Sequence, residues 1–486
     1  MMLYDLINQV NHGPITGANT DITGITLDSR RVKQGFLFIC IRGLQSDGHD
    51  YIEAAAANGA AAILCEAIPD NLPAGITMIK TADTRLAMAH IAANFHGRPA
   101  AEMPMLAVTG TNGKTSITYF MEAILRAWGK RAGVIGTSGA RVGDEALAIP
   151  YATSTTPDPV ELHQILRAMQ DKGAETVVME ATSHALALRK LAGIPFRIGM
   201  FTNLTQDHLD FHGTMAQYAA DKAVLFTQCE TGVFNADDAH TPAMTAGATC
   251  RVITYGIDAD CNYKAENITL SHEGIAYDVQ IKGEAIHIES PVPGRFSVYN
   301  TLCVVAAASE MGIPAATIAE GLRHMKNVPG RIQAVPNNKG FGVIIDYAHT
   351  PDGVANILRA VRGFTKGRVI TVIGCGGDRD KTKRPIMGEI AGGGSDYVIL
   401  TSDNPRSENP ADIIAEMEAG VRQTSCPYYK LANRREAIFE AVQMAQAGDN
   451  IILAGKGSED YQEFENKRRE PFDDARVAQE ALEARE

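Results

Sequence analysis

The sequence predicts an α/β protein of three domains, with a central P-loop ATPase domain built on a parallel sheet and a C-terminal Rossmann-like domain. First, short apolar runs recur along the chain, each followed by a polar or Gly-rich turn and helical periodicity, which is typical of parallel sheets. Second, 486 residues are more than one hydrophobic core normally serves. Third, TGTNGKTS lies between an apolar run and a helix-like segment, as a phosphate-binding loop requires.

Breaks in this pattern divide the chain. The first break is the sequence Gly97-Arg98-Pro99, which follows a helix-like run over 85–95. The second lies in the stretch VPGRIQAVPNNKGFG at 328–342, where prolines and glycines gather. We therefore predict domains at 1–98, 99–330 and 331–486.

The composition excludes several classes of protein. No apolar run approaches the roughly 20 residues of a membrane helix, so we expect no membrane insertion. A formal net charge of -12 disfavours a nucleic-acid partner, because phosphate backbones are bound mainly by surplus Lys and Arg. The start MMLYDLINQV has no basic or apolar signal region, so we expect a cytoplasmic protein. Eight cysteines without a C-x-x-C pair predict reduced thiols and neither a zinc site nor disulfides.

The unusual motifs follow predicted strands. In the central part, TGTNGKT, EATSH and TNLTQDHLD follow apolar runs at 105–108, 176–179 and 198–201. In the last part, DYAHTPD, GCGGDRD, TSDNPRSENP and AGKGSED follow runs at 343–345, 369–373, 397–400 and 451–453. Ligands of parallel sheets bind at the carboxyl ends of the strands, so we expect the chemistry there. The segment 250–290, with its alternating stretch ITLSHEGIAYDVQIKGEAIHI, predicts an antiparallel meander without chemistry of its own.

The phosphate loop has the residues its chemistry needs. Backbone N–H groups of 110–113 would surround the phosphates, Lys114 would add a charge and the Thr115 hydroxyl would reach Mg²⁺. The following segment places apolar residues on one helical face, namely Ile117, Phe120, Met121, Ile124, Leu125 and Trp128. The motif departs from the standard loop because Val108 stands where a Gly is usual, six positions before Lys114. The alternative interpretation is a Gly-rich turn between strand and helix that binds nothing.

Two further residues are candidate metal ligands. Glu180 directly follows the run TVVM, and His208 lies in NLTQDHLDFH. Phosphoryl transfer needs such groups to hold a metal ion near the phosphate. Each alone is more typical of an ordinary loop residue, and the neighbouring P-loop favours the metal interpretation.

Six motifs in a fixed order now indicate a family. TGTNGKTS, MEATSHAL, TNLTQDHLDFHG, PGR, DYAHTPD and GKGSE together resemble the Mur ligase family of ATP-dependent, amide-bond-forming enzymes. That family's phosphate loop reads G-T-N-G-K-T/S, which accounts for the shortened motif. More narrowly, DSRRV, STTPD at 154–158 and DNPRSENP at 403–410 resemble the branch that adds meso-diaminopimelate.

The resemblance implies a reaction. The D-glutamate carboxylate of UDP-MurNAc-L-Ala-D-Glu would attack the γ-phosphate of ATP in the presence of Mg²⁺, and meso-diaminopimelate would displace phosphate from the resulting acyl phosphate. The resemblance also assigns the UDP-sugar to 1–98, ATP to 99–330 and the amino acid to 331–486. It implies a monomer.

The resemblance assigns residues to the nucleotide and the metal. The triphosphate would contact Gly110, Thr111, Asn112, Gly113, Lys114, Thr115 and Ser116. Thr115, Glu180, His208 and Lys222 would hold metal, the last as a lysine carbamylated by carbon dioxide. Arg331 would act on the phosphates, and Asn300 and Asp346 would hold the nucleoside. The ordinary interpretation of Lys222 is an exposed helix lysine.

It also assigns the two other substrates. The UDP-muramoyl dipeptide would contact Leu27, Ser29, Thr155, Thr156, Thr182 and Lys190. The diaminopimelate end would contact Arg379, Asp403, Asn404, Pro405, Arg406, Gly455 and Glu459. Three departures stand out: Thr182 replaces a family Ser, Ser458 replaces a family His, and either Arg189 or Lys190 takes the place of a family Arg. For the basic cluster Arg379, Lys381, Lys383 and Arg384, and for its lysines above all, a solvated charged loop is the alternative.

Two other functions compete with this one. Folylpolyglutamate synthetase shares the ATP chemistry, but DSRRV and about 98 residues before the P-loop disfavour it. A non-catalytic nucleotide-binding switch is the rival of another class, and it leaves Glu180, His208 and DNPR without a role.

Overall fold

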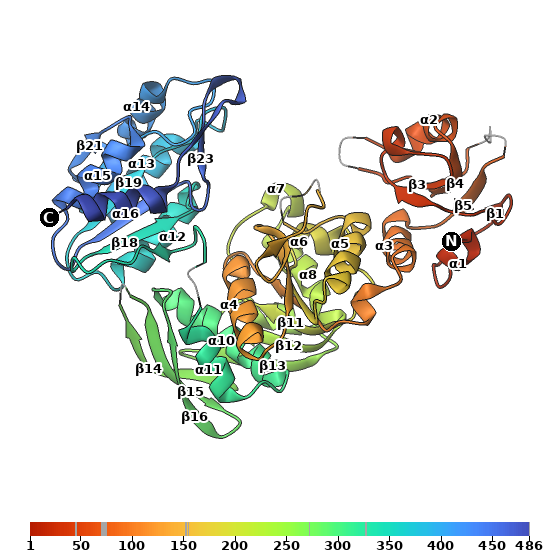
Figure 1. Ribbon diagram of the computed structural model, residues 1–486, viewed down its shortest axis with the longest axis horizontal. Coiled ribbons are helices and arrows are strands. Elements are labelled where there is room, and N and C mark those ends of the chain that lie inside the picture. The colour runs from red at the N-terminus through yellow and green to blue at the C-terminus, as the bar shows by residue number, and fades with distance from the viewer. Residues whose placement is uncertain are drawn as a thin grey trace. The chain divides into compact units, whose positions relative to one another are not determined.

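The computed structural model describes residues 1–43, 46–69, 75–150, 153, 155–271, 273–325 and 328–485. They form two compact units, Met1–Asn262 with Cys303–Ile313, and Tyr263–Leu302 with Pro314–Glu486 (Figure 1). The predicted α/β class is confirmed, because each unit combines helices with parallel strands. The boundaries at 98 and 330 stay a prediction.

The first unit begins with a five-stranded sheet of order β1-β5-β4-β3-β2, parallel except for β1. Its strands are β1 (Ile15–Thr16), β2 (Gly24–Thr26), β3 (Phe36–Ile39), β4 (Ala60–Cys65) and β5 (Thr77–Lys80). Its helices are α1 (Leu3–Leu6), α2 (Ile52–Ala57) and α3 (Thr84–Phe95), with 3-10 turns η1 (Ser29–Arg31), η2 (Gly48–Tyr51) and η3 (Pro99–Ala101). Successive strand residues such as Leu37 and Phe38 point to opposite faces and join separate apolar clusters, so both faces of the sheet are buried.

The central sheet holds the phosphate loop. Its strands run in the order β13-β12-β11-β6-β10-β7-β8-β9 and are parallel from β13 to β7, while β8 and β9 form an antiparallel edge. The strands are β6 (Met105–Thr109), β7 (Ala132–Gly136), β8 (Gly139–Val142), β9 (Glu145–Ala146), β10 (Thr176–Glu180), β11 (Phe196–Phe201), β12 (Cys229–Asn235) and β13 (Arg251–Gly256). The three predicted strands of this part are confirmed. The predicted meander begins too early, because 251–256 pairs in parallel with β12.

Helices cover this sheet. They are α4 (Lys114–Ala127), α5 (Pro159–Asp171), α6 (Ser183–Ala187), α7 (Leu209–His212), α8 (Met215–Ala223), η4 (Val224–Thr227) and α9 (Thr241–Thr245). The predicted apolar face of α4 is buried from Ile117 to Leu125. Trp128 is the exception: the helix ends at Ala127, so Trp128 is the C-cap residue, its backbone N–H donates to the Ile124 carbonyl at 2.9 Å, and it is half-buried. All eight cysteines are free thiols, as predicted, and four are fully buried.

The second unit begins with an antiparallel meander, as the alternating pattern predicts. It consists of β14 (Tyr263–Leu270), β15 (Ile275–Ile281) and β16 (Glu284–Ser290), and α11 (Ala315–Arg323) packs on β16. Tyr277 and Val279 of β15 point into the core, while the intervening Asp278 is part of a surface cluster with Asn267 and His287. The helix α10 (Arg295–Glu310) follows the meander.

The last sheet has the order β17-β18-β22-β19-β20-β21 and is parallel except for β17. Its strands are β17 (Gln333–Ala334), β18 (Gly342–Asp346), β19 (Val369–Ile373), β20 (Tyr397–Leu400), β21 (Tyr428–Lys430) and β22 (Asn450–Ala454). One apolar cluster joins the sheet to α12 (Pro351–Arg362), α13 (Lys383–Gly394) and α14 (Pro410–Val421), and another joins it to α15 (Arg434–Met444) and α16 (Asp474–Ala484). Helices on both faces confirm the Rossmann-like prediction.

A small hairpin accompanies this sheet. It is formed by β23 (Tyr461–Glu463) and β24 (Arg469–Pro471), joined through η5 (Glu465–Lys467). Within the part of the chain that the structure describes, no helix has both the length and the apolar character needed to cross a membrane.

Candidate active site

The phosphate loop connects β6 to α4 and is fixed by the end of β11. Gly110 has a φ of +151°, and a Cβ there would lie 1.9 Å from Thr202 Oγ1, so only glycine fits. Thr202 donates to the carbonyl of Asn112 at 2.6 Å, and the Asn112 N–H donates to Asn203 at 2.9 Å. Lys114 Nζ donates to the carbonyls of Gly110 and Thr111, both at 2.9 Å. The Lys114 ammonium therefore lies over the loop, where a phosphate would bind.

A buried carboxylate stands beside the loop. Glu180 ends β10 and is only 1% exposed, and it accepts a hydrogen bond from Thr115 Oγ1 at 3.0 Å. It also accepts from the N–H of Thr137 at 2.9 Å and from its hydroxyl at 3.2 Å. Sequence reasoning missed Thr137, although it directly follows strand β7 at the carboxyl edge of the sheet. Thr115 and Glu180 thus present adjacent oxygen donors, the type of ligand that Mg²⁺ prefers.

Lys222 is buried, contrary to the ordinary interpretation of a helix lysine. It lies on α8 with 1% exposure, its Nζ donates to the Gly110 carbonyl at 3.0 Å, and it stands 4.5 Å from the centre of the Tyr218 ring. Burial, and secondarily the charge of Lys114, holds the pKa of Lys222 well below its usual value. The structure therefore favours a neutral amine at this position.

His208 reaches the same region from the loop before α7. Its backbone is left-handed with a φ of +52°, its side chain is half-exposed, and its ring lies edge-on to His184 at 4.9 Å. Its ring centre is 6.4 Å from that of Tyr218, whose hydroxyl lies 3.3 Å from Thr111 Oγ1 in the phosphate loop. Among the described residues, no three or more His, Cys, Asp or Glu side chains are grouped as metal ligands. The oxygen donors of Thr115 and Glu180 fit Mg²⁺, whereas an unmodified Lys222 offers nitrogen and not the oxygen ligand that Mg²⁺ prefers.

A buried network that sequence reasoning missed lies behind these residues. His212 has a fully buried side chain, with Nε2 at 2.9 Å from Ser183 Oγ and Nδ1 at 2.6 Å from Asp221 Oδ2. The His212 ring also packs on Tyr218 at 4.8 Å. The network ties the start of α6 to α7 and α8. Ser183 lies within TSH and His212 within DHLDFH, but Asp221 lies in neither motif and no spacing rule pairs the three residues, so only the fold reveals the network.

The threonines assigned to the muramoyl dipeptide converge on Glu180. Thr156 Oγ1 donates to the Glu180 carbonyl at 2.9 Å and lies 3.1 Å from Thr182 Oγ1, while Thr155 Oγ1 lies 3.1 Å from Thr137 Oγ1. The Thr182 hydroxyl caps α6 by accepting from the Ala185 N–H at 3.3 Å. Ser154, the first residue of STTPD, lies outside the described residues.

Lys190, and not Arg189, lies against the STTPD motif. Lys190 is 8% exposed and pairs with Asp158 at 2.8 Å. Arg189 has a φ of +57°, is half-exposed and pairs with Asp83 at 3.1 Å, at the start of α3. Lys190 is thus the cation in contact with this motif, and its contact with the muramoyl group stays a prediction.

The residues assigned to the uridine end follow β2. Leu27 is half-buried against the apolar core of the five-stranded sheet. Ser29 begins η1, and its backbone carbonyl accepts from Asn58 Nδ2 at 2.9 Å. Asp28 caps this turn by accepting from the Arg30 N–H at 3.0 Å. The DSRRV motif is thus a capped turn at the carboxyl end of a strand.

Three residues assigned to the nucleotide belong to the second unit. Asn300 is buried on α10, and Arg331 lies 5.2 Å from the centre of the Tyr347 ring. Asp346 ends β18 and accepts from the Ile332 N–H at 2.9 Å. Burial raises the pKa of Asp346, despite the opposing effects of that bond and of Arg331.

The amine motif forms one network of ion pairs and hydrogen bonds. Asn404 donates to Glu459 Oε2 at 2.8 Å, and the fully buried Lys456 donates to both residues at 3.1 Å. Asp403 is buried beside them, and burial raises its pKa against the opposing charges of Arg434 and Lys456. Gly455, with a φ of +114°, leaves room for this carboxylate, since a Cβ there would lie 2.6 Å from Asp403 Oδ2. Sequence reasoning missed Lys456 as a member of the network.

Arg406, next to Pro405, has a left-handed backbone with a φ of +51°. Its guanidinium donates to the Gly377 carbonyl at 2.7 Å and to Glu463 Oε1 at 3.1 Å. Arg379 is exposed in the neighbouring loop and donates to the Asp378 carbonyl at 3.3 Å. Arg406 is thus joined to the network of Asn404 through Glu463, whose N–H donates to Asn404 Oδ1 at 2.9 Å.

The basic cluster 379–384 serves partly to hold this motif in place. Arg384 is fully buried and donates two hydrogen bonds to the carboxylate of Glu408 in DNPRSENP, at 2.8 and 2.9 Å. Lys381 pairs with the same carboxylate at 3.0 Å. Arg384 also donates to Glu416 of α14 at 2.8 Å. The solvated-loop interpretation is therefore wrong for Arg384, whereas Lys381 is 61% exposed and fits it despite its ion pair.

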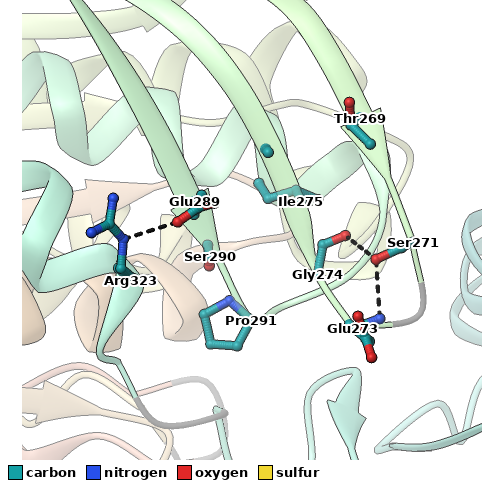
Figure 2. Close-up of a pocket in the computed structure, with 10 residues that line it drawn as sticks. Thr269, Ser271, Glu273, Gly274, Ile275, Glu289, Ser290, Pro291 and Arg323 are labelled. Carbon is teal, nitrogen blue, oxygen red and sulfur yellow. Dashed lines mark hydrogen bonds and ion pairs between the residues drawn. The ribbon is translucent and has the colours of Figure 1, made fainter.

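A separate hollow of about 260 Å³ lies in the meander (Figure 2). Its polar groups bond to one another: Arg323 donates to Glu289 at 2.9 Å, and the Glu273 N–H donates to Ser271 Oγ at 3.2 Å. None of the predicted site residues lines it, and we assign no ligand to it.

Three family models match the chain in order. "Mur ligase family, catalytic domain" matches 21–96, "Mur ligase middle domain" matches 108–308, and "Mur ligase, glutamate ligase domain" matches 330–457. The chain is therefore a three-domain, mixed α/β protein of this kind.

Individual relatives extend over the whole chain. A UDP-N-acetylmuramoyl-L-alanyl-D-glutamate--2,6-diaminopimelate ligase of Caldanaerobacter subterraneus is 44% identical over 99% of both chains. A solved structure of a protein with that name is 32% identical, covers 95% of each chain and has a TM-score of 0.73. A Mycobacterium tuberculosis folylpolyglutamate synthase is 18% identical, covers 76% of this chain and 92% of its own, and has a TM-score of 0.60, which shows a shared fold alone.

The Arg384–Glu408 pair predicts acid sensitivity. Hydrogen bonds from Arg384 lower the pKa of Glu408 from 4.5 to about 2. A depressed folded-state pKa adds stability that is fully present above 4.5 and is lost as the pH falls through about 2. We expect Glu408→Gln to be less stable than wild type in urea unfolding at pH 6, with the gap shrinking at pH 4 and pH 3. The exposed Glu440→Gln is the matched control, and an unchanged gap at pH 3 would contradict the assignment.

Proposed function

The chain belongs to the Mur ligase family, and we propose that it is the ATP-dependent ligase that adds meso-diaminopimelate to UDP-N-acetylmuramoyl-L-alanyl-D-glutamate in peptidoglycan precursor synthesis. The observation that carries this proposal is the amine motif. Asp403 and Glu459 can receive an ammonium, while Arg406, which is joined to the same network through Glu463 and Asn404, can receive a carboxylate. Those are the charges of the distal end of diaminopimelate, and lysine has only the first.

The reaction proceeds in two steps. A carboxylate oxygen of the D-glutamyl group attacks the γ-phosphorus of ATP, the bond to ADP breaks, and an acyl phosphate results. The amine nitrogen of diaminopimelate then attacks the acyl carbon, phosphate leaves with the electrons of the C–O bond, and the ammonium proton is released. Phosphorylation is needed because a free carboxylate does not react with amines at neutral pH. The protein supplies no covalent nucleophile.

The residues of the phosphate loop position ATP and stabilise its charge. The N–H groups at the start of α4 and the Lys114 ammonium bind the triphosphate. Thr115, Glu180, His208 and a carbamylated Lys222 would hold Mg²⁺, which neutralises phosphate charge when it is bound. Arg331, Asn300 and Asp346 are further residues that we propose for the nucleotide.

The muramoyl substrate is held by the group around Glu180. Thr155, Thr156 and Thr182 offer hydroxyls, and Lys190 offers a cation that Asp158 keeps in place. Leu27 and Ser29 are the proposed contacts of the uridine end.

An assay of ADP release with the UDP-muramoyl dipeptide, with folate or with neither tests the proposed function. A folylpolyglutamate synthetase would release ADP with folate, and a nucleotide-binding switch would respond to neither substrate.

Lys114→Ala is expected to remove turnover and to leave the fold intact. The side chain donates to backbone carbonyls of the loop and contributes little packing, whereas one such electrostatic contact to a reacting phosphate typically supplies a factor of about 100 to 1,000. ADP release and thermal unfolding measure the two effects. The surface lysine variant Lys130→Ala is the control, and more than about a tenth of wild-type activity in Lys114→Ala would refute the role.

Lys222 is expected to carry a carbamate. Carbon dioxide adds to a neutral amine, and the lowered pKa of this buried side chain favours that form. A crystal structure of the Mg-ATP complex should show added density on Nζ of Lys222. Lys456, which is equally buried but paired with Glu459, should show none. A bare amine on Lys222 at high resolution would count against the proposal.

The wild-type enzyme is expected to prefer meso-diaminopimelate over L-lysine strongly, and Arg406→Ala is expected to lose most of that preference. Lysine leaves the charged end of Arg406 without a substrate partner, while diaminopimelate offers a carboxylate that a guanidinium can bind through two bonds. The ratio of kcat/KM for the two amines measures this. The exposed Arg359→Ala should keep the wild-type ratio, and equal kcat/KM values for both amines in wild type would sink the assignment.

A further inference from the structure

The hairpin β23–β24 lies along the amine motif and is bound to it mainly through its backbone. The Arg406 N–H donates to the Glu463 carbonyl at 3.0 Å, and the Glu463 N–H donates to Asn404 Oδ1 at 2.9 Å. Gln462 adds a side-chain bond to the Asp403 carbonyl at 2.8 Å. The hairpin is therefore a wall of the site, although its sequence carries no motif used above.

One side chain of this wall contacts the specificity cation. Glu463 Oε1 accepts from Arg406 Nε at 3.1 Å, and both side chains are mostly buried, with 16% and 21% exposure. On its other side, the Arg406 guanidinium donates through Nη1 to Gly377 at 2.7 Å. A Cβ on Gly376 would lie 3.0 Å from the same Nη1, so the loop backbone closes against the guanidinium. Arg406 is thus held between the hairpin and the glycine loop.

We propose that Glu463 is a positioning residue of the amine subsite, which holds the Arg406 guanidinium by its Nε so that the terminal nitrogens face the distal carboxylate of the amino-acid substrate. This inference rests on the proposed function and deepens it. Glu463 does not touch the substrate; it acts through Arg406.

Glu463 is itself anchored as a charged carboxylate. Its second oxygen accepts from Arg469 Nε at 3.2 Å, and Arg469 lies 4.0 Å from the centre of the Tyr461 ring. Burial alone would raise the pKa of Glu463, but the bonds from Arg469 and Arg406 outweigh it and leave the pKa below its ordinary value. The carboxylate therefore stays ionised and keeps its hold on Arg406 near neutral pH.

The geometry divides the donors of Arg406 between protein and substrate. A guanidinium has five N–H donors. That of Arg406 donates to Glu463 through Nε and to Gly377 through Nη1. A long Arg side chain that loses such a partner gains rotamer freedom, which a carboxylate must restrict again when it binds. Removal of Glu463 should consequently weaken the binding of an amine that carries a distal carboxylate and leave the binding of lysine nearly unchanged.

Two variants of Glu463 separate positioning from charge. Glu463→Ala removes the acceptor of the Nε bond, whereas Glu463→Gln keeps an oxygen acceptor and removes the charge. We expect Glu463→Ala to raise KM for meso-diaminopimelate about tenfold with kcat nearly unchanged, as for the loss of one hydrogen bond to a charged group. Glu463→Gln should stay within about threefold of wild type.

The controls distinguish this role from a structural one. Glu465→Ala changes an exposed carboxylate on the same hairpin and should leave every KM unchanged. In Glu463→Ala, KM for ATP, KM for the UDP-muramoyl dipeptide and the melting temperature should stay near wild type, because the backbone contacts of the hairpin remain.

The outcomes also separate this inference from the function on which it rests. If wild type prefers meso-diaminopimelate and Arg406→Ala loses the preference, but Glu463→Ala keeps wild-type KM values, the positioning role is refuted and the function stands. If wild type does not discriminate between the amines, the proposed function fails first. An equal loss of binding for lysine and diaminopimelate in Glu463→Ala would also overturn the positioning role.

Discussion

The buried carboxylate of Glu180 is the constraint on which the site of the first unit depends. The carboxylate accepts from Thr115 of α4 and from Thr137 after β7, while the backbone carbonyl of Glu180 accepts from Thr156. A carboxylate with 1% exposure is costly unless such partners surround it, so the strand ends and the phosphate loop must meet at this point. The hydrogen bonds to its two oxygens offset the cost of burying the charge. These oxygens are also the type of ligand that Mg²⁺ prefers.

The proposed amine site of the second unit differs, because most of its charged side chains are paired with opposite charges of the protein. Lys456 pairs with Glu459, and Arg384 pairs with Glu408. Arg406 pairs with Glu463. Breaking a buried pair by removing one partner leaves an uncompensated charge, so these pairs hold the loop between β20 and α14 in one conformation. A substrate that carries both an ammonium and a carboxylate can then bind to groups that are already oriented.

Much of this could be predicted from the chain alone, for reasons that differ between residues. Glu180 and Asp403 each follow an apolar run, and the structure confirms that these runs are parallel strands with Glu180 at the end of β10 and Asp403 just after β20. Thr137 follows the same rule but stands in no motif, so it was missed. The Ser183–His212–Asp221 network and Glu463 had no local signal, because their partners are set by packing between helices and by the docking of a hairpin. The segment 251–256 joined the parallel sheet because its strand pairing is decided by β12, not by its own alternation.

The sequence by itself determined the fold class, the order of the strands and helices, the phosphate loop and the resemblance to the Mur ligases, since each depends on local periodicity or on residues adjacent along the chain. Only the tertiary structure decided which side chains share a site. It buried Lys222 against the phosphate loop, paired Lys190 with Asp158, and set Glu463 against Arg406 across 57 positions of sequence. The physical reason is that burial, pKa and ion pairing depend on neighbours in space, and no local pattern encodes contacts between residues that lie far apart in the chain.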